Sequence, residues 1–196
     1  MTNKYELTNE IVEWRGVTLY RIKALRDIKI AVSGDIIKKG QLGGFVDSVA
    51  RLSQDGNCWI EKYARVYGKA NVYEDAYVSG VTEVSGQAKV YGQAEVFGNA
   101  IVDGKAEVSG NAEVFGNAGV FGCTRVYGNA IVAGNSKVTG NARILGNVQV
   151  YGNAEVSDEA VLVGDVKLSG DIRIGDRDVL SGDIHIECNG QIKVAA

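Results

Sequence analysis

Hydrophobic positions recur at a fixed interval through most of this chain. From Val66 onward an aliphatic residue stands at every sixth position as far as Leu180, and no insertion breaks the register. Two positions after most of these residues comes glycine, often followed by asparagine and then by a small residue, so that the unit reads Val-x-Gly-Asn-Ala-x. A constant short period is the signature of a repeat architecture.

The repeat predicts short strands joined by corners. Alternate side chains of a strand point to opposite faces, so the alanine and valine of Ala-x-Val-x face inward and the two x residues face outward. We expect Gly-Asn to form each corner, because these two residue types adopt positive φ at the lowest cost. Three sides of six residues close a triangular coil of 18 residues, and coils about 4.8 Å apart would pair each strand with the next.

The chain divides into a repetitive and a non-repetitive part. The register can be followed back through Ile60 and, more loosely, to Leu42, which predicts a hexapeptide-repeat β-helix over residues 42–196 with about eight coils. Residues 1–41 do not repeat and form the predicted N-terminal β cap. Two apolar runs around Arg15-Gly16 predict a β-hairpin there, which would protect the open edge of the first coil from pairing with other chains.

The repeat resembles the hexapeptide-repeat β-helix of many bacterial acyltransferases, in which an aliphatic and a small residue also point inward. The resemblance implies an all-β, left-handed, parallel β-helix solenoid; the hand is taken from that family. Glycine stands two places after the aliphatic residue here, whereas the common acyltransferase pattern has it directly after. The C-terminal runs Gly164-Asp165-Val166 and Gly170-Asp171-Ile172 resemble the bactofilins, which are polymerising β-helices.

A second resemblance concerns the N-terminal region. Four segments are similar to the head of a family of phage and prophage accessory proteins whose tails carry the same hexapeptide repeats, and this similarity implies a viral origin. The segments are YELT (5–8), LYRIKAL (19–25), KGQLGGFV (39–46) and LSQDGNCWI (52–60).

Composition argues against several partners and indicates the cellular compartment. The net charge of −3 and the pI near 5.3 argue against duplex nucleic acid as a partner. No window approaches the roughly 18 to 20 apolar residues of a membrane span, and the N-terminus lacks the apolar stretch of a signal peptide, so we expect a cytoplasmic protein. Cys58, Cys123 and Cys188 are widely separated and only one histidine accompanies them, so we expect reduced thiols and no metal site.

Enzymatic chemistry finds little support in the sequence. Hexapeptide acyltransferases use a histidine as general base, and the only histidine, His185, falls at an outward position in the final coils. The unbroken register leaves no room between Val66 and Leu180 for a loop that would cover an acceptor. We therefore predict a non-enzymatic protein with no catalytic residue and no cofactor, and keep an acyltransferase as the enzyme alternative.

The outward positions sort into three sides with different chemistry. The first side combines aromatic residues with cations: Tyr73, Lys89, Tyr91, Arg125, Tyr127, Arg143 and Leu145. The second side is apolar and acidic: Tyr77, Glu95, Phe97, Glu113, Phe115, Ile131 and Tyr151. The third side is mostly polar: Arg65, Glu83, Asp103, Lys137, Glu155 and Arg173, with Ile101 and Phe121.

Exposed aromatic ladders on two sides predict an interface. The basic first side and the acidic second side are complementary, and a heterologous contact around a triangular prism closes most naturally as a homotrimer. The alternative is that the ladders only stack along the solenoid. A sharper hypothesis is that Lys89, Tyr91, Arg125, Tyr127 and Arg143 bind a small anionic ligand with a ring, such as a nucleotide.

Together these patterns predict a phage-type accessory protein that acts in the bacterial host cytoplasm. It would bind or sequester a host component, either a protein or an anionic nucleotide, and could oppose an antiviral pathway. A bactofilin-like structural polymer is the non-enzymatic alternative, based on the C-terminal resemblance.

Overall fold

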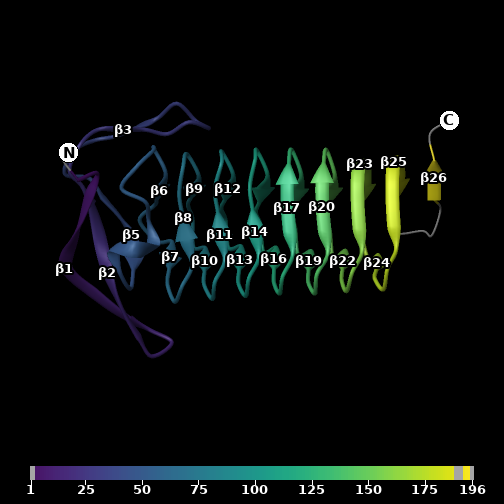
Figure 1. Ribbon diagram of the computed structural model, residues 1–196, viewed down its shortest axis with the longest axis horizontal. Helices are drawn as coiled ribbons and strands as arrows, with labels where there is room; N and C mark the ends of the chain where they lie inside the picture. Colours follow the sequence, from purple (N-terminus) through teal and green to yellow (C-terminus); the bar gives the residue numbers. More distant parts are fainter. Residues whose placement is uncertain (1–2, 188–191, 195–196) are drawn as a thin grey trace.

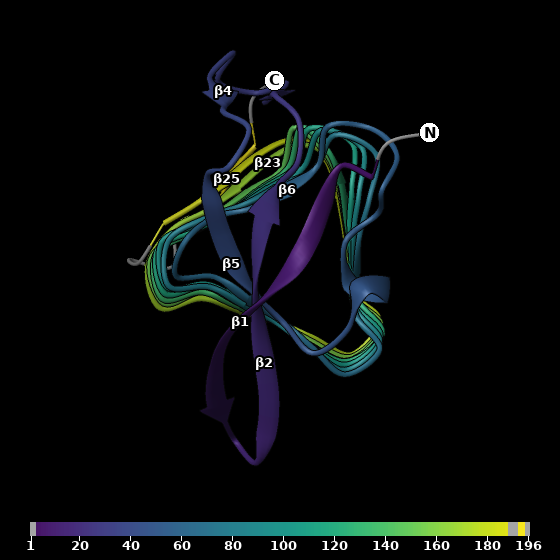
Figure 2. The same ribbon diagram turned by 90° about the vertical axis from the view of Figure 1, so that its left-hand side faces the viewer.

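The structure is a computed structural model that describes residues 3–187 and 192–194. Short parallel strands stack along one axis as a β-solenoid of about eight turns (Figure 1). Strand partners such as Lys89 and Glu107 are 18 residues apart, and the end-on view in Figure 2 shows the coils superposed in a three-sided outline. The predicted all-β parallel solenoid with 18-residue coils is confirmed, whereas the left-handed winding stays a prediction.

One sheet of ten strands runs from the N-terminal hairpin along the third side. Its first pairs, β1–β2 and β2–β5, are antiparallel, and the parallel ladder starts at β5–β7. In spatial order the sheet contains β1 (Tyr5–Trp14), β2 (Val17–Ala24), β5 (Leu42–Val46), β7 (Arg65–Val66), β10 (Glu83–Val84), β13 (Ile101–Val102), β16 (Gly119–Val120), β19 (Lys137–Val138), β22 (Glu155–Val156) and β24 (Arg173–Ile174).

A second sheet of 14 strands covers the other two sides. The first side contains β8 (Asn71–Val72), β11 (Lys89–Val90), β14 (Glu107–Val108), β17 (Arg125–Gly128) and β20 (Arg143–Gly146). The second side contains β6 (Trp59–Ile60), β9 (Tyr77–Val78), β12 (Glu95–Val96), β15 (Glu113–Val114), β18 (Ile131–Val132) and β21 (Gln149–Val150). Both sides continue into β23 (Val161–Leu168), which pairs with β20 and with β21, and then into β25 (Val179–Ile186). β26 (Ile192–Val194) pairs antiparallel with β25.

Helix is almost absent from the fold. Within residues 3–187 and 192–194 the only helical element is the 3₁₀ turn η1 (Val49–Arg51), which connects the cap to the first coil. The described part of the chain contains no helix long and apolar enough to cross a lipid bilayer.

The core is a stack of inward aliphatic residues. Val108 is fully buried between Val90 and Val126 of the adjacent coils, as the repeat predicts. Each such valine contributes about 1.5–3 kcal/mol by leaving water. Packing of the same residue type at every coil keeps the three sides in register, so the outward side chains form straight rows.

Glycine and asparagine contribute to the corners in different ways. Gly128 has φ of +82°, and a Cβ there would lie 2.9 Å from the backbone nitrogen of Gly146 in the next coil. Among the described residues, the non-glycine positions with positive φ are Arg15, Glu74, Asp158 and Asp176. The predicted backbone role of asparagine is therefore wrong; its side chain instead links coils, as when Asn129 Nδ2 donates to Asn147 Oδ1 at 3.0 Å.

The predicted N-terminal hairpin is present and extends beyond the expected strands. β1 and β2 pair from Tyr5 with Ala24 to Trp14 with Val17. The two turn residues between them have φ of 49° and 78°, the combination that a type I′ turn requires. The Arg65 guanidinium stacks 3.9 Å from the centroid of the Trp14 ring, so the end of the hairpin contacts the third side.

β5 closes the N-terminal end of the core. The first turn, from Val46 to its partner Val66, is two residues longer than the later coils. A Cβ on Gly44 would lie 2.5 Å from Ala64 O and from Ile60 Cγ2. The Gly43-Gly44 pair is needed because β5 crosses directly over the first coil.

A buried polar cluster ties the chain start to the first coil. Tyr5 is 1% exposed, and its hydroxyl donates to the carbonyls of Val49 (2.7 Å) and Leu52 (2.8 Å). Lys4 Nζ donates to Cys58 Sγ at 3.0 Å. Cys58 is a free buried thiol and Cys123 a free exposed one; Cys188 lies outside the described residues.

An arm that the sequence did not predict lies over the second side. Residues 28–37, named here the arm, contain β3 (Ile28–Lys29) and β4 (Ile36–Ile37), which pair antiparallel. Figure 1 shows the arm extending along the coils from the capped end. Ile28, Ile30 and Ile37 are buried in the same apolar cluster as Trp59 and the partly buried Tyr77.

Candidate functional site

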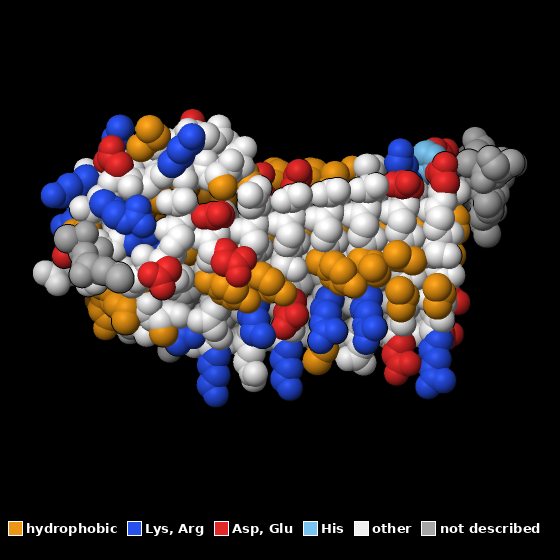
Figure 3. All heavy atoms as spheres, turned by 45° about the horizontal axis from the view of Figure 1, so that its top comes forward, with side chains coloured by type: hydrophobic (Ala, Val, Ile, Leu, Met, Phe, Trp, Pro, Cys, Tyr) orange, Lys and Arg blue, Asp and Glu red, His pale blue; other side chains and the backbone are white. Residues whose placement is uncertain are grey.

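Outward side chains on the first side form two parallel rows, because the residues before and after each inward valine both point outward. The charged row contains Asn71, Lys89, Glu107, Arg125, Arg143 and Val161. The aromatic row contains Tyr73, Tyr91, Ser109, Tyr127, Leu145 and Val163. Figure 3 shows hydrophobic side chains running beside Lys and Arg side chains along this surface.

The charged row contains a carboxylate that the sequence analysis overlooked. Glu107 Oε1 lies 3.0 Å from Lys89 Nζ, and its Oε2 lies 3.6 Å from Arg125 Nε. The 18-residue register could have found it, because position 107 falls midway between 89 and 125. Arg143 follows in the next coil, in register with Arg125, and has no carboxylate within 4.0 Å among the described residues.

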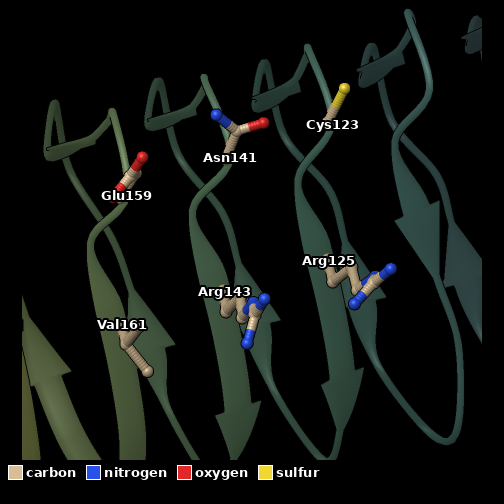
Figure 4. Close-up of a pocket in the computed structure, with 6 residues that line it drawn as sticks. All are labelled: Cys123, Arg125, Asn141, Arg143, Glu159 and Val161. Carbon is tan, nitrogen blue, oxygen red and sulfur yellow. The ribbon is translucent and has the colours of Figure 1, made fainter. Parts of the chain in front are cut away.

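A groove runs between the charged row and the neighbouring corner. Its larger part has a volume of about 540 Å³ and is lined by Cys123, Arg125, Asn141, Arg143, Glu159 and Val161 (Figure 4). A second hollow of about 310 Å³ shares Cys123 and Arg125 and continues past Lys89, Lys105 and Glu107. We call these two adjoining hollows the first-side groove. Two guanidinium groups and the Asn141 amide offer donors to an anion there.

The corner beside this groove differs from the other two. The corner between the first and second sides carries an amide ladder in which Asn111, Asn129 and Asn147 each donate to the next coil, ending on Asp165. The corner between the second and third sides carries a similar ladder that ends on Asp171. At the third corner the equivalent positions are Lys69, Gln87, Lys105, Cys123, Asn141, Glu159 and Arg177, so chemical variety is concentrated next to the first side.

The aromatic row is stacked where consecutive coils both carry a ring. Tyr73 and Tyr91 have ring centroids 4.8 Å apart and planes 5° apart. Burial, followed by the neighbouring Tyr91, raises the pKa of Tyr73 to about 12. Tyr127 lies further along the row and is 37% exposed.

The second side brings its predicted residues together, but the arm shares part of that surface. Phe97 and Phe115 stack at 4.7 Å. Glu95 and Glu113 pair in register and line a hollow of about 300 Å³ together with Ala31 and Val32 of the arm.

Burial raises the pKa of several side chains on this side. Burial and then Glu113 raise the pKa of Glu95, and burial followed by Glu113 also raises the pKa of Tyr151. The Tyr77 hydroxyl donates to Glu61 Oε1 at 3.0 Å, and burial raises the pKa of Tyr77. Tyr77 is therefore only partly available to a partner on the second side.

His185 does not join the first-side groove. It lies in β25 on the second side, in register with Lys167, and its Nε2 is 3.8 Å from Glu187 Oε1. Within the residues that the structure describes, no three His, Cys, Asp or Glu side chains converge to hold a metal ion.

No model of a known protein family matches the chain, and a search of curated proteins finds no match. The resemblances to acyltransferases, bactofilins and phage accessory proteins stay predictions from the residues that carry them.

Proposed function

We propose that this chain is a non-catalytic binding protein that sequesters an anionic component of its host cell in the first-side groove. The observation that carries the proposal is the pair Arg125 and Arg143, which lie in register on adjacent coils and line the 540 Å³ part of the groove. Adjacent guanidinium groups suit phosphate or carboxylate, which they hold with charge-assisted hydrogen bonds. Among the described residues Arg143 has no carboxylate within 4.0 Å, and Glu159, which also lines the groove, pairs with Arg177 at 3.0 Å.

Two further observations support the proposal: one favours binding over catalysis, and the other favours a phage setting. The single histidine of the chain, His185, lies in the last coil on the second side rather than in the groove, so the groove lacks the usual general base. The resemblance of residues 5–8, 19–25, 39–46 and 52–60 to phage and prophage accessory proteins supports action in the cytoplasm of an infected or lysogenic bacterium.

Calorimetric titration with small anions tests the proposal. Inorganic pyrophosphate, ribose 5-phosphate and nucleoside monophosphates are titrated into the whole chain and into Arg143→Glu. We expect at least one of these anions to bind, with affinity reduced at least about tenfold in the variant, because an attractive charge becomes repulsive.

The matched control is Arg173→Glu. Arg173 is 88% exposed on the third side and pairs with Glu155, so its reversal changes net charge equally while leaving the groove intact. Binding by none of the anions, or equal weakening by both reversals, would contradict a specific anion site in the groove.

A further inference from the structure

The aromatic row of the first side is interrupted by one coil that carries no ring. Tyr73 and Tyr91 occupy consecutive coils, and Tyr127 occupies the second coil after Tyr91. The coil between them carries Ser109, whose side chain cannot stack. In Figure 3 the hydrophobic row is interrupted between two groups of side chains. We call this position the Ser109 gap.

At strand spacing, one planar ring would fit between Tyr91 and Tyr127. Rings on consecutive coils already stack, with centroids 4.8 Å apart for Tyr73 and Tyr91 and 4.7 Å apart for Phe97 and Phe115. Tyr91 and Tyr127 are two coils apart, which corresponds to about 9.6 Å at strand spacing. A ring placed in the gap would therefore lie about 4.8 Å from each tyrosine, within the offset-stacked range.

The polar groups around the gap suit a ring with N–H donors and an anionic tail. Glu107 lies in β14, which Ser109 directly follows, and belongs to the adjacent charged row. Its carboxylate contacts Lys89 and Arg125, and its remaining lone pairs can accept from ring nitrogens. Arg125 and Arg143 occupy the next two coils. A ring in the gap would thus have its acceptor in its own coil and cations for its anionic group toward the C-terminal coils.

We propose that the Ser109 gap is a base-binding slot, in which the base of a nucleotide stacks between Tyr91 and Tyr127 while its phosphate contacts Arg125 and Arg143. This inference rests on the proposed function and names the ligand class of the same surface. The base supplies stacking on two faces, and the phosphate supplies the charge contact that the groove offers.

The test places an aromatic side chain of the protein itself in the Ser109 gap. In Ser109→Tyr the introduced side chain would complete the stack and exclude a base. Adenosine and guanosine 5′-monophosphate are compared with ribose 5-phosphate, which carries the same phosphate and no base. In the unaltered chain we expect a nucleotide to bind at least about tenfold more tightly than ribose 5-phosphate, and in Ser109→Tyr we expect that advantage to vanish while ribose 5-phosphate affinity is unchanged.

Two further variants keep the test decisive. Thr139→Tyr adds a ring to the third side, beside Phe121, and should leave all affinities unchanged. Tyr127→Leu removes one stacking face while keeping an apolar residue beside Leu145, and should reduce nucleotide affinity alone, so the slot can be tested even where Ser109→Tyr does not fold.

The possible failures are distinguishable. If no anion binds, the proposed function itself fails. If nucleotides and ribose 5-phosphate bind equally, or if Ser109→Tyr binds nucleotides as tightly as the unaltered chain, the groove holds a phosphate but the slot does not hold a base. If Ser109→Tyr instead changes the sedimentation of the protein without affecting nucleotides, the gap receives a side chain of a second copy, and the inference is overturned.

Discussion

At the scale of single residues, the cap depends on polar groups that are buried with partners. Tyr5 and Lys4 bring their side chains from the start of the chain to carbonyls and a thiol near the first coil. Burial raises the pKa of Tyr5 to about 12, lowers the pKa of Lys4 and raises the pKa of Cys58. The stability of the cap should therefore respond to alkaline pH.

Tyr5→Phe tests this response. At pH 7 the variant should be less stable by about 1–2 kcal/mol, because two carbonyls lose their donor. The folded-state pKa of Tyr5 is raised from 10.0 to about 12, so the stability it contributes is complete below pH 10 and is lost as the pH rises from 10 to 12. Over that window the unaltered chain should lose about 2–3 kcal/mol more than the variant.

Urea denaturation from pH 7 to pH 12 measures both effects. Tyr63→Phe is the control, because Tyr63 is 56% exposed and its substitution should cost little stability at pH 7. Parallel profiles for Tyr5→Phe and the unaltered chain would show that the phenol does not titrate differently in the two states.

The register predicts which residues share a side, but not how they pair. The repeat is sufficient to place Lys89, Arg125 and Arg143 on one side, because they are separated by multiples of the 18-residue coil. It could also have shown Glu107, which was overlooked because cations and rings were selected by type. The ladder role of Asn129 was missed for another reason: a side-chain bond between coils depends on rotamers, which the period does not specify.

At the scale of elements, the Gly43-Gly44 pair decides whether β5 can cap the core. In Gly44→Ala the added carbon would meet Ala64 O and Ile60 Cγ2 at 2.5 Å, so we expect a loss of about 3 kcal/mol or more. Gly182→Ala is the matched control, with φ of +92° and nothing within 4 Å, and should cost only about 1–2 kcal/mol of backbone strain.

Thermal unfolding followed by tryptophan fluorescence, to which the buried Trp59 contributes, compares the two glycine variants. A markedly larger drop in melting temperature is expected for Gly44→Ala. Equal drops would mean that β5 can move away from the first coil without loss.

The elements of the cap were harder to predict than the coils. The hairpin around Arg15-Gly16 was visible because two apolar runs flank a turn pair. The arm was not, because its strands have two residues each and its isoleucines follow no period. Its position beside Glu95 and Glu113 depends on burial of its isoleucines in the apolar core, which only the folded chain brings together.

At the scale of the whole molecule, the homotrimer stays a prediction, and the structure changes the contacts on which it would rely. Lys89 and Arg125 already pair with Glu107 within the chain, and Glu95 lies beside the arm. Assembly through the first and second sides would therefore depend mainly on aromatic rings.

Phe97→Glu combined with Phe115→Glu tests that assembly. The inward valines are untouched, so we expect folded monomers in sedimentation experiments if these sides meet. Phe121→Glu on the third side is the control and should leave the oligomer intact. An unchanged oligomer in the double variant would remove the second side from the interface.

A side takes six residues and a coil takes 18, so the effect of an insertion or deletion depends on whether its length is a multiple of six or of 18. Eighteen added residues would lengthen the rod by one step of about 4.8 Å and leave every surface in place. Six added residues between Arg125 and Arg143 would preserve the hydrophobic interior but turn the remainder of the rod by a third of a revolution, carrying Arg143 onto the second side. A single duplicated repeat can therefore exchange three surfaces at once, so a lineage of such chains could change partners without redesigning its interior.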